Sequence, residues 1–186
     1  MNQEQRQNLL GMKAFLCSEA FFFTALILGF VYVRHITPDW DATQRLLEWK
    51  SAGAYSLLLV LSSFTLNAGV KSFEKQRHGL FRFWAVATLV LGSVFLFNQL
   101  REYGKLIGES VLVNNSLFGS AYYTLTGVHT AHVIIGLILL LLIFVLMITG
   151  KVGRPSSGVL AIEYYWHFVD VVWIVVYSTV YLGGFV

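Results

Sequence analysis

The chain has 186 residues, of which 56% are hydrophobic and only 12% are charged. Water-soluble domains carry about 25% charged residues, so this composition excludes an ordinary soluble domain. The single cysteine, Cys17, excludes a disulfide-rich secreted scaffold, and an aromatic content of 16% excludes a disordered chain. No dense run of basic residues occurs, so nucleic acid is not an expected partner. The composition therefore predicts an integral membrane protein.

Long apolar segments follow one another along the whole chain. Each has at least about 20 residues, enough to cross a hydrocarbon core of about 30 Å as a helix that rises about 1.5 Å per residue. Continuous apolarity without alternation favours helices over membrane strands. The segments are residues 10–36, 51–70, 80–102, 120–149 and 161–184. Because the connections are short, we expect one all-α membrane bundle of five transmembrane helices, forming a single domain over residues 1–186.

The placement of basic residues sets the expected orientation. More lysines and arginines lie on the side of the N-terminus, so the positive-inside rule predicts a cytoplasmic N-terminus and a C-terminus outside. The loop 37–50, with Trp40 and Trp49, is expected to lie along the outer interface as an aromatic anchor. The candidates for contact with lipid headgroups are Lys71, Lys75, Arg77 and Arg82 on the cytoplasmic side, and Arg101 and Glu102 at the outer boundary.

The last apolar segment carries ionisable residues on one helical face. Glu163, His167 and Asp170 are spaced by four and three residues, so they lie on the same side of a helix. A carboxylate at the depth of Asp170 costs about 2.5–3.5 kcal/mol, so it must face protein and find a partner, for which His167 is the nearest group. We interpret this face as a structural polar lock against His129 and His132 of the fourth segment. A proton-handling or cofactor site is the alternative.

Other ionisable residues also lie inside apolar segments. Glu19 lies near the middle of the first segment, and it fits a structural hydrogen-bonded acid, a proton antenna or a lipid-contact site. His129 and His132 are spaced by three residues and would need further ligands to hold a metal, with His167 as a geometrically possible third. We favour hydrogen bonds between helices for this pair and expect no metal in the chain.

Four motifs in chain order resemble subunit III of the haem-copper oxidases. They are Ser18-Glu19 with the phenylalanines that follow, QLREY at 99–103, GVHTAHVIIG at 127–136 and YYWHFVDVVW at 164–173. Thr130 stands where the family usually has glycine, for which we expect a small packing adjustment. Many members of the family have seven spans, and this chain is similar to the last five, as in the short bacterial form.

The resemblance implies an accessory subunit that binds no cofactor and is not catalytic by itself. Its complex would be a proton-pumping terminal oxidase of the cytochrome c type in a bacterial inner membrane. The expected partners are the catalytic subunit I, which would hold the haems and copper, together with other oxidase subunits and bound phospholipid. In that complex the chain would stabilise subunit I and support proton uptake. Subunit III of a quinol oxidase of the same superfamily is the alternative.

A five-helix membrane anchor that carries two haems and reacts with quinone is a rival from another class. The chain has five histidines, which gives this hypothesis some support. However, His35 and His78 lie at or beyond the ends of predicted helices. His129 and His132 share one helix, so they cannot hold one haem from opposite sides. A proton-coupled transporter is disfavoured because the spans contain no proline break and no repeat.

Overall fold

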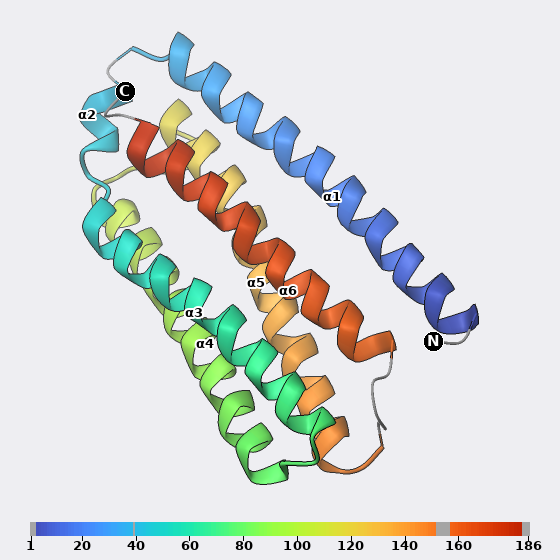
Figure 1. Ribbon diagram of the computed structural model, residues 1–186. Helices are drawn as coiled ribbons and strands as arrows, with labels where there is room; N and C mark the ends of the chain where they lie inside the picture. Colours follow the sequence, from blue (N-terminus) through green and yellow to red (C-terminus); the bar gives the residue numbers. More distant parts are fainter. Residues whose placement is uncertain (1–2, 39, 152–156, 184–186) are drawn as a thin grey trace.

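The computed structural model describes residues 3–38, 40–151 and 157–183. Over these residues the chain is all-helical, with five helices long and apolar enough to cross a membrane, which confirms the expected fold class. The helices are α1 (Gln3–Ile36), the short α2 (Trp40–Gln44), α3 (Trp49–Glu74), α4 (His78–Gly108), α5 (Leu117–Ile148) and α6 (Ser157–Tyr177), which continues as the π-helix η1 (Ser178–Leu182) (Figure 1). The predicted end of the last span, residue 184, lies outside the described residues.

The last helix forms the centre of the bundle. α6 packs against α1, α3 and α5, whereas α1 packs against α5 and α6 at one side of the molecule (Figure 1). Within the most apolar part of each span, 44% of the residues from α6 and η1 are buried, compared with 11% of those from α1. The remaining strong pairings are α3 with α4 and α4 with α5. The polar residues of α6 therefore lie where three other helices can reach them.

A single tryptophan joins α6 to three of its neighbours. Trp166 is fully buried, and its indole nitrogen donates a hydrogen bond to Ser62 Oγ of α3 at 2.9 Å. Its ring fits against Gly92 of α4 and Gly136 of α5, where glycine leaves room for it. A Cβ added to Gly136 would lie 2.8 Å from Trp166 Cε3, and one added to Gly92 would lie 3.0 Å from Trp166 Cη2. These two glycines are therefore required by the close approach of the ring.

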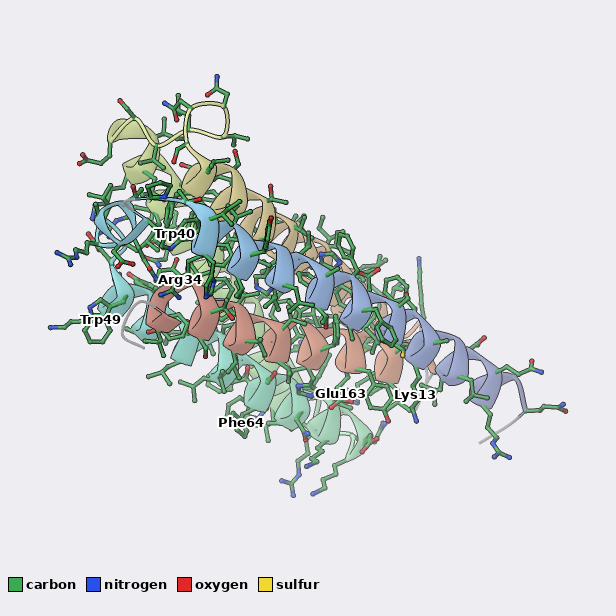
Figure 2. All side chains as sticks on the ribbon, turned by 90° about the horizontal axis from the view of Figure 1, so that it is seen from above. Lys13, Arg34, Trp40, Trp49, Phe64 and Glu163 are labelled. Carbon is green, nitrogen blue, oxygen red and sulfur yellow. The ribbon has the colours of Figure 1, made fainter. Side chains whose placement is uncertain are left out.

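The expectation that Trp40 is an interface anchor is wrong. Trp40 is only 4% exposed, and its ring packs edge-on against Phe30 of α1 and Phe118 of α5, with centroids 5.2 and 4.8 Å away. The helical turn of α2 directs this side chain into the end of the bundle. Trp49, by contrast, is 42% exposed and lies next to the ammonium group of Lys50, as an interface residue would. Figure 2 shows Trp40 and Trp49 at the same end of the molecule as Arg34.

Substitution of Gly136 by alanine tests the seat of Trp166. The added methyl group would overlap a buried ring, so we expect Gly136→Ala to lower the free energy of unfolding by about 1–3 kcal/mol. Gly127→Ala, on the same helix, is the matched control because a Cβ there meets nothing within 4 Å. Reversible unfolding in mixed micelles measures both variants. Equal stability of the two variants would contradict the assigned role of Gly136.

Candidate functional site

The polar side chains of α6 meet a row of hydroxyl groups on α3. Three serines of α3 each bond a ring nitrogen of α6, and we call this contact the α3–α6 seam. The pairs are Ser56 with Trp173 at 2.7 Å, Ser62 with Trp166 at 2.9 Å, and Ser63 with His167 at 2.8 Å. At the end of the seam where α3 begins and α6 ends, the Tyr177 hydroxyl donates to the Trp49 carbonyl at 3.0 Å. The two helices are thus joined by hydrogen bonds along much of their length.

The hydrogen-bond donor to Asp170 is a serine of the α3–α6 seam. The carboxylate is 4% exposed and accepts a hydrogen bond from Ser63 Oγ at its Oδ2 atom. A serine hydroxyl has one proton, so His167 Nδ1 must be the donor in its own bond to Ser63. The other ring nitrogen, Nε2, then faces Glu163 Oε1 at 3.9 Å. These contacts form one continuous chain of polar groups, which runs from Glu163 through His167 and Ser63 to Asp170. Ser63 thus bridges His167 and Asp170, which the sequence predicts to be partners.

Glu19 meets His132 across the contact between α1 and α5. Glu19 Oε2 lies 3.2 Å from His132 Nε2, and both side chains are largely enclosed, at 19% and 16% exposure. His132 Nδ1 must donate to the Val128 carbonyl, 2.8 Å away, because a carbonyl oxygen can only accept. Nε2 therefore bears a proton only when the ring is an imidazolium. A hydrogen bond between His132 Nε2 and Glu19 therefore requires a proton held either by the carboxyl group or by the ring.

His129 is surrounded by aromatic rings. It is fully buried, stacks on Trp173 with centroids 4.8 Å apart, and meets Phe23 and Phe95 edge-on. Neither of its ring nitrogens has a hydrogen-bond partner among the described residues. The His129 ring therefore packs with aromatic side chains of α1, α4 and α6.

The five residues predicted to form one lock lie in three separate places. Glu163, His167 and Asp170 engage the α3–α6 seam, His132 pairs with Glu19 of α1, and His129 packs among rings. The polar face of α6 therefore meets α3, where α5 was expected. Among the described residues, no group of three or more His, Cys, Asp or Glu side chains is arranged to hold a metal ion.

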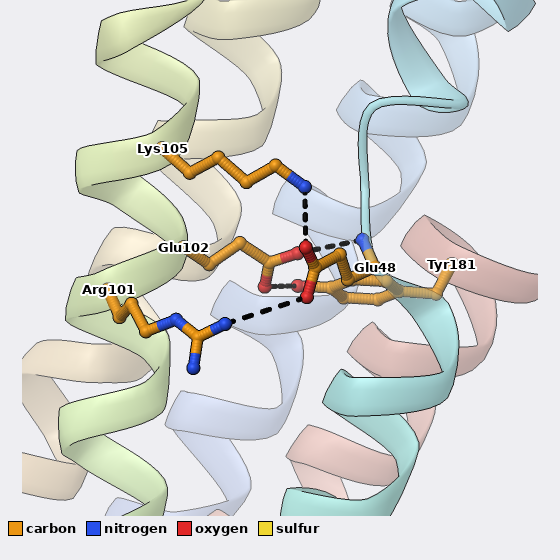
Figure 3. A network of polar contacts seen from close by, with 5 residues as sticks. All are labelled: Glu48, Arg101, Glu102, Lys105 and Tyr181. Atoms are coloured by element: carbon orange, nitrogen blue, oxygen red, sulfur yellow. Dashed lines mark hydrogen bonds and ion pairs between the residues drawn. The ribbon is translucent and has the colours of Figure 1, made fainter.

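A further polar network ties the ends of α3, α4 and η1 together (Figure 3). Glu102 is 8% exposed, and it accepts from the Tyr181 hydroxyl at 2.6 Å and from the Glu48 backbone N–H at 3.4 Å. Lys105 Nζ donates to Glu48 Oε1 at 2.6 Å, while Arg101 approaches the other oxygen at 3.9 Å. The hydrogen bond and charge of Lys105 hold the pKa of the Glu48 carboxyl below its usual range.

The residues predicted to contact lipid headgroups differ in their exposure and in their contacts. Glu102 points into the bundle toward Tyr181, and Arg101 faces Glu48 at the surface. The basic residues near the turn between α3 and α4 are all exposed, and they are Lys71, Lys75, Arg77 and Arg82. Glu102, a predicted headgroup contact at the outer boundary, therefore bonds within the bundle in this structure. The four basic residues are exposed and can contact a membrane surface.

Sequence reasoning missed the partners that complete these sites. Ser56 and Ser63 are seven residues apart and so lie on one helical face, a spacing that could have identified the hydroxyl row on α3. Nothing in the local sequence singles out Tyr181 as the partner of Glu102. Thr130, expected to cause only a packing adjustment, also lies 3.1 Å from the Tyr103 hydroxyl through its Oγ1 atom. That contact adds a polar link between α4 and α5.

Comparison with known proteins adds an independent finding. The profile of the family described as cytochrome c oxidase subunit III matches residues 3–185. The chain is 36% identical to a probable cytochrome c oxidase subunit 3 of Nocardia farcinica over 92% of its length and 86% of that protein. It is 37% identical to cytochrome c oxidase subunit 3 of Synechocystis over 94% of its length and 75% of that protein. It is also 32% identical to quinol oxidase subunit 3 of Bacillus subtilis, over 96% of its length and 88% of that protein.

Proposed function

The chain belongs to the cytochrome c oxidase subunit III family, and on that premise we propose that it is the accessory third subunit of a haem-copper terminal oxidase of the cytochrome c type. The observation that carries this proposal is the extent of the family match, residues 3–185, on a bundle of five membrane-length helices. Its polar groups support a scaffolding role, because they bond one another across helix pairs. Examples are Ser63 with Asp170 and Tyr181 with Glu102.

In this proposal the haems and copper belong to a partner, the catalytic subunit I, and the chain stabilises that subunit. Its membrane is the bacterial inner membrane, with the N-terminus in the cytoplasm, so that the exposed basic cluster Lys71, Lys75, Arg77 and Arg82 meets anionic headgroups there. Bound phospholipid is a further expected component.

A quinol oxidase is the second candidate complex. It is favoured by the relative from Bacillus subtilis, which is named for a quinol oxidase and aligns with almost all of this chain. The two candidates share the accessory role of the chain and differ in the electron donor. The donor would be bound by other subunits, so oxidation of reduced cytochrome c compared with oxidation of quinol by the purified complex distinguishes them.

Purification through an affinity tag on this chain, in a mild detergent, tests the proposal. We expect larger membrane subunits to co-purify, and we expect a haem spectrum that stays with those subunits when the complex is separated. Mass spectrometry identifies the polypeptides, and a reduced-minus-oxidised spectrum follows the haem. A chain that purifies alone and shows a b-type haem band would contradict the proposal and support a haem-carrying anchor.

We further propose that the Glu19–His132 pair supports the proton supply of the complex, because Glu19 Oε2 lies 3.2 Å from His132 Nε2, close enough for a proton to pass between the carboxyl group and the ring, and neither side chain is fully buried. In Glu19→Gln the amide cannot exchange that proton. We therefore expect initial turnover near that of the unchanged complex and a faster loss of activity during sustained turnover. Glu109→Gln, at an exposed position, is the control. Unchanged inactivation kinetics in Glu19→Gln would leave a structural or lipid-contact role for Glu19.

A further inference from the structure

A cavity of about 790 Å³ lies at the end of the bundle where α1, α2 and η1 meet. The residues that line it include Arg34, His35 and Thr37 at the end of α1, Asp41 of α2, and Gly183 directly after η1. The apolar span of α1 ends at Ile36, so the cavity lies at the level of lipid headgroups. Figure 2 shows Arg34 and Trp40, which also lines the cavity, at this end of the molecule. In the orientation proposed above, this end is on the outer side of the membrane.

The guanidinium group of Arg34 is held in this cavity without a polar partner. Arg34 is half-buried, and it lies so close to the end of η1 that a Cβ added to Gly183 would overlap Arg34 Nη1. No hydrogen bond or ion pair with a described residue involves the guanidinium group. All five of its N–H groups are donors, and a donor that is withdrawn from water without an acceptor is costly. A ligand that supplies oxyanion acceptors is therefore favoured in this cavity.

The Asp41 carboxylate gives the cavity a second unpaired charge, of opposite sign. Asp41 is exposed, and among the described residues its carboxylate forms no hydrogen bond and no ion pair, either with Arg34 or with another group. The side chains of His35 and Thr37 donate to carbonyls of the preceding turn of α1, at 2.8 and 2.6 Å. The cavity thus presents one cation and one carboxylate that do not neutralise each other. A ligand with both a phosphate and an ammonium group complements this pair, whereas a simple anion complements only Arg34.

An exposed apolar stripe runs along α1 from this cavity. Tyr32, Leu28 and Phe21 lie three, seven and fourteen residues before His35, so they share its helical face. Their exposed fractions are 66%, 64% and 74%. Leu28 and Phe21 require no hydrogen bonds, so acyl chains can solvate them, and tyrosine is typical of the level between acyl chains and headgroups. The charged cavity and the stripe together fit a phospholipid better than they fit a free anion.

We propose that this cavity binds the headgroup of a phospholipid with a primary ammonium group, such as phosphatidylethanolamine. Its phosphate would lie on Arg34, its ammonium group on Asp41, and an acyl chain along the stripe of α1. A phosphatidylglycerol headgroup offers no cation to Asp41, so it fits the cavity less well. This inference rests on the proposed function, in which bound phospholipid is expected, and adds a site and a headgroup class.

Lipid titration of the intact complex tests the proposal. The complex is purified through a tag on this chain, freed of exchangeable lipid in mild detergent, and titrated with phosphatidylethanolamine or phosphatidylglycerol of the same acyl chains. Native mass spectrometry resolves the bound lipids and gives their Kd. The variants are Arg34→Gln and Asp41→Asn. Arg45→Gln is the matched control, because Arg45 is exposed just after α2 and does not line the cavity.

We expect the unchanged complex and Arg45→Gln to bind phosphatidylethanolamine more tightly than phosphatidylglycerol. Arg34→Gln should weaken the binding of both lipids by about tenfold, because the charge-assisted hydrogen bonds to phosphate are lost. Asp41→Asn should abolish the preference for phosphatidylethanolamine without weakening the binding of phosphatidylglycerol. If Arg34→Gln does not assemble, the loss of preference in Asp41→Asn decides alone.

Three results would overturn the proposed lipid site. They are equal affinity of the unchanged complex for the two lipids, equal affinities in Arg34→Gln and Arg45→Gln, and a preference that persists in Asp41→Asn. Displacement of the lipid by inorganic phosphate would assign the cavity to a free anion, and so would also overturn it. In each case the co-purified subunits would leave the proposed function intact. Isolation of this chain without other subunits would instead overturn the proposed function, and the same titration of the isolated chain would still decide the lipid site.

Discussion

The arrangement of the helices depends on hydrogen bonds between α3 and α6. Moving apolar side chains of these two helices from lipid into a contact with each other gains little free energy. Acyl chains are as apolar as leucine side chains, so helices in a membrane associate through packing and through polar contacts. Here the hydroxyls of Ser56, Ser62 and Ser63 bond ring nitrogens on α6, and Ser63 also bonds Asp170. Once α6 is fixed to α3, the ring of Trp166 is directed against the glycines of α4 and α5.

The remaining polar groups join the other helices to this centre. Glu19 and His132 join α1 to α5 near the middle of the bundle, and Tyr181 brings η1 to Glu102 of α4 at one end. The π-helical turn of η1 adds a link there, since the Val180 carbonyl accepts a hydrogen bond from Gln44 of α2 at 2.6 Å. Ionisable residues in these spans are thus used to position helices. Such a bundle can serve as a support for catalytic subunits, which is the role proposed for this member of the subunit III family.

The sequence predicts the helices better than it predicts their neighbours. Five long apolar runs determine five spans, and the spacing of Glu163, His167 and Asp170 places them on one face of α6. The sequence does not say which helix covers that face, because periodicity describes one helix at a time. The sequence predicts that His129 and His132 face the polar side of α6, but the serines of α3 do so. A serine in an apolar helix can bond a neighbouring helix or face lipid, and the sequence does not distinguish these two cases. Trp40 was misplaced for a related reason. The turn made by α2 determines whether that ring points toward the membrane interface or toward Phe30 and Phe118.

The importance of the α3–α6 contact can be measured with a pair of serine substitutions. Ser63→Ala removes the hydroxyl that bonds both Asp170 and His167, whereas Ser93→Ala removes an exposed hydroxyl from the middle of α4. Reversible unfolding in mixed micelles should show a loss of about 1–3 kcal/mol for Ser63→Ala, the cost of leaving the buried Asp170 carboxylate without its hydrogen-bond donor, and almost no change for Ser93→Ala. Equal stability of the two variants would show that the hydrogen bonds of Ser63 add nothing to the contact between α3 and α6, contrary to this account.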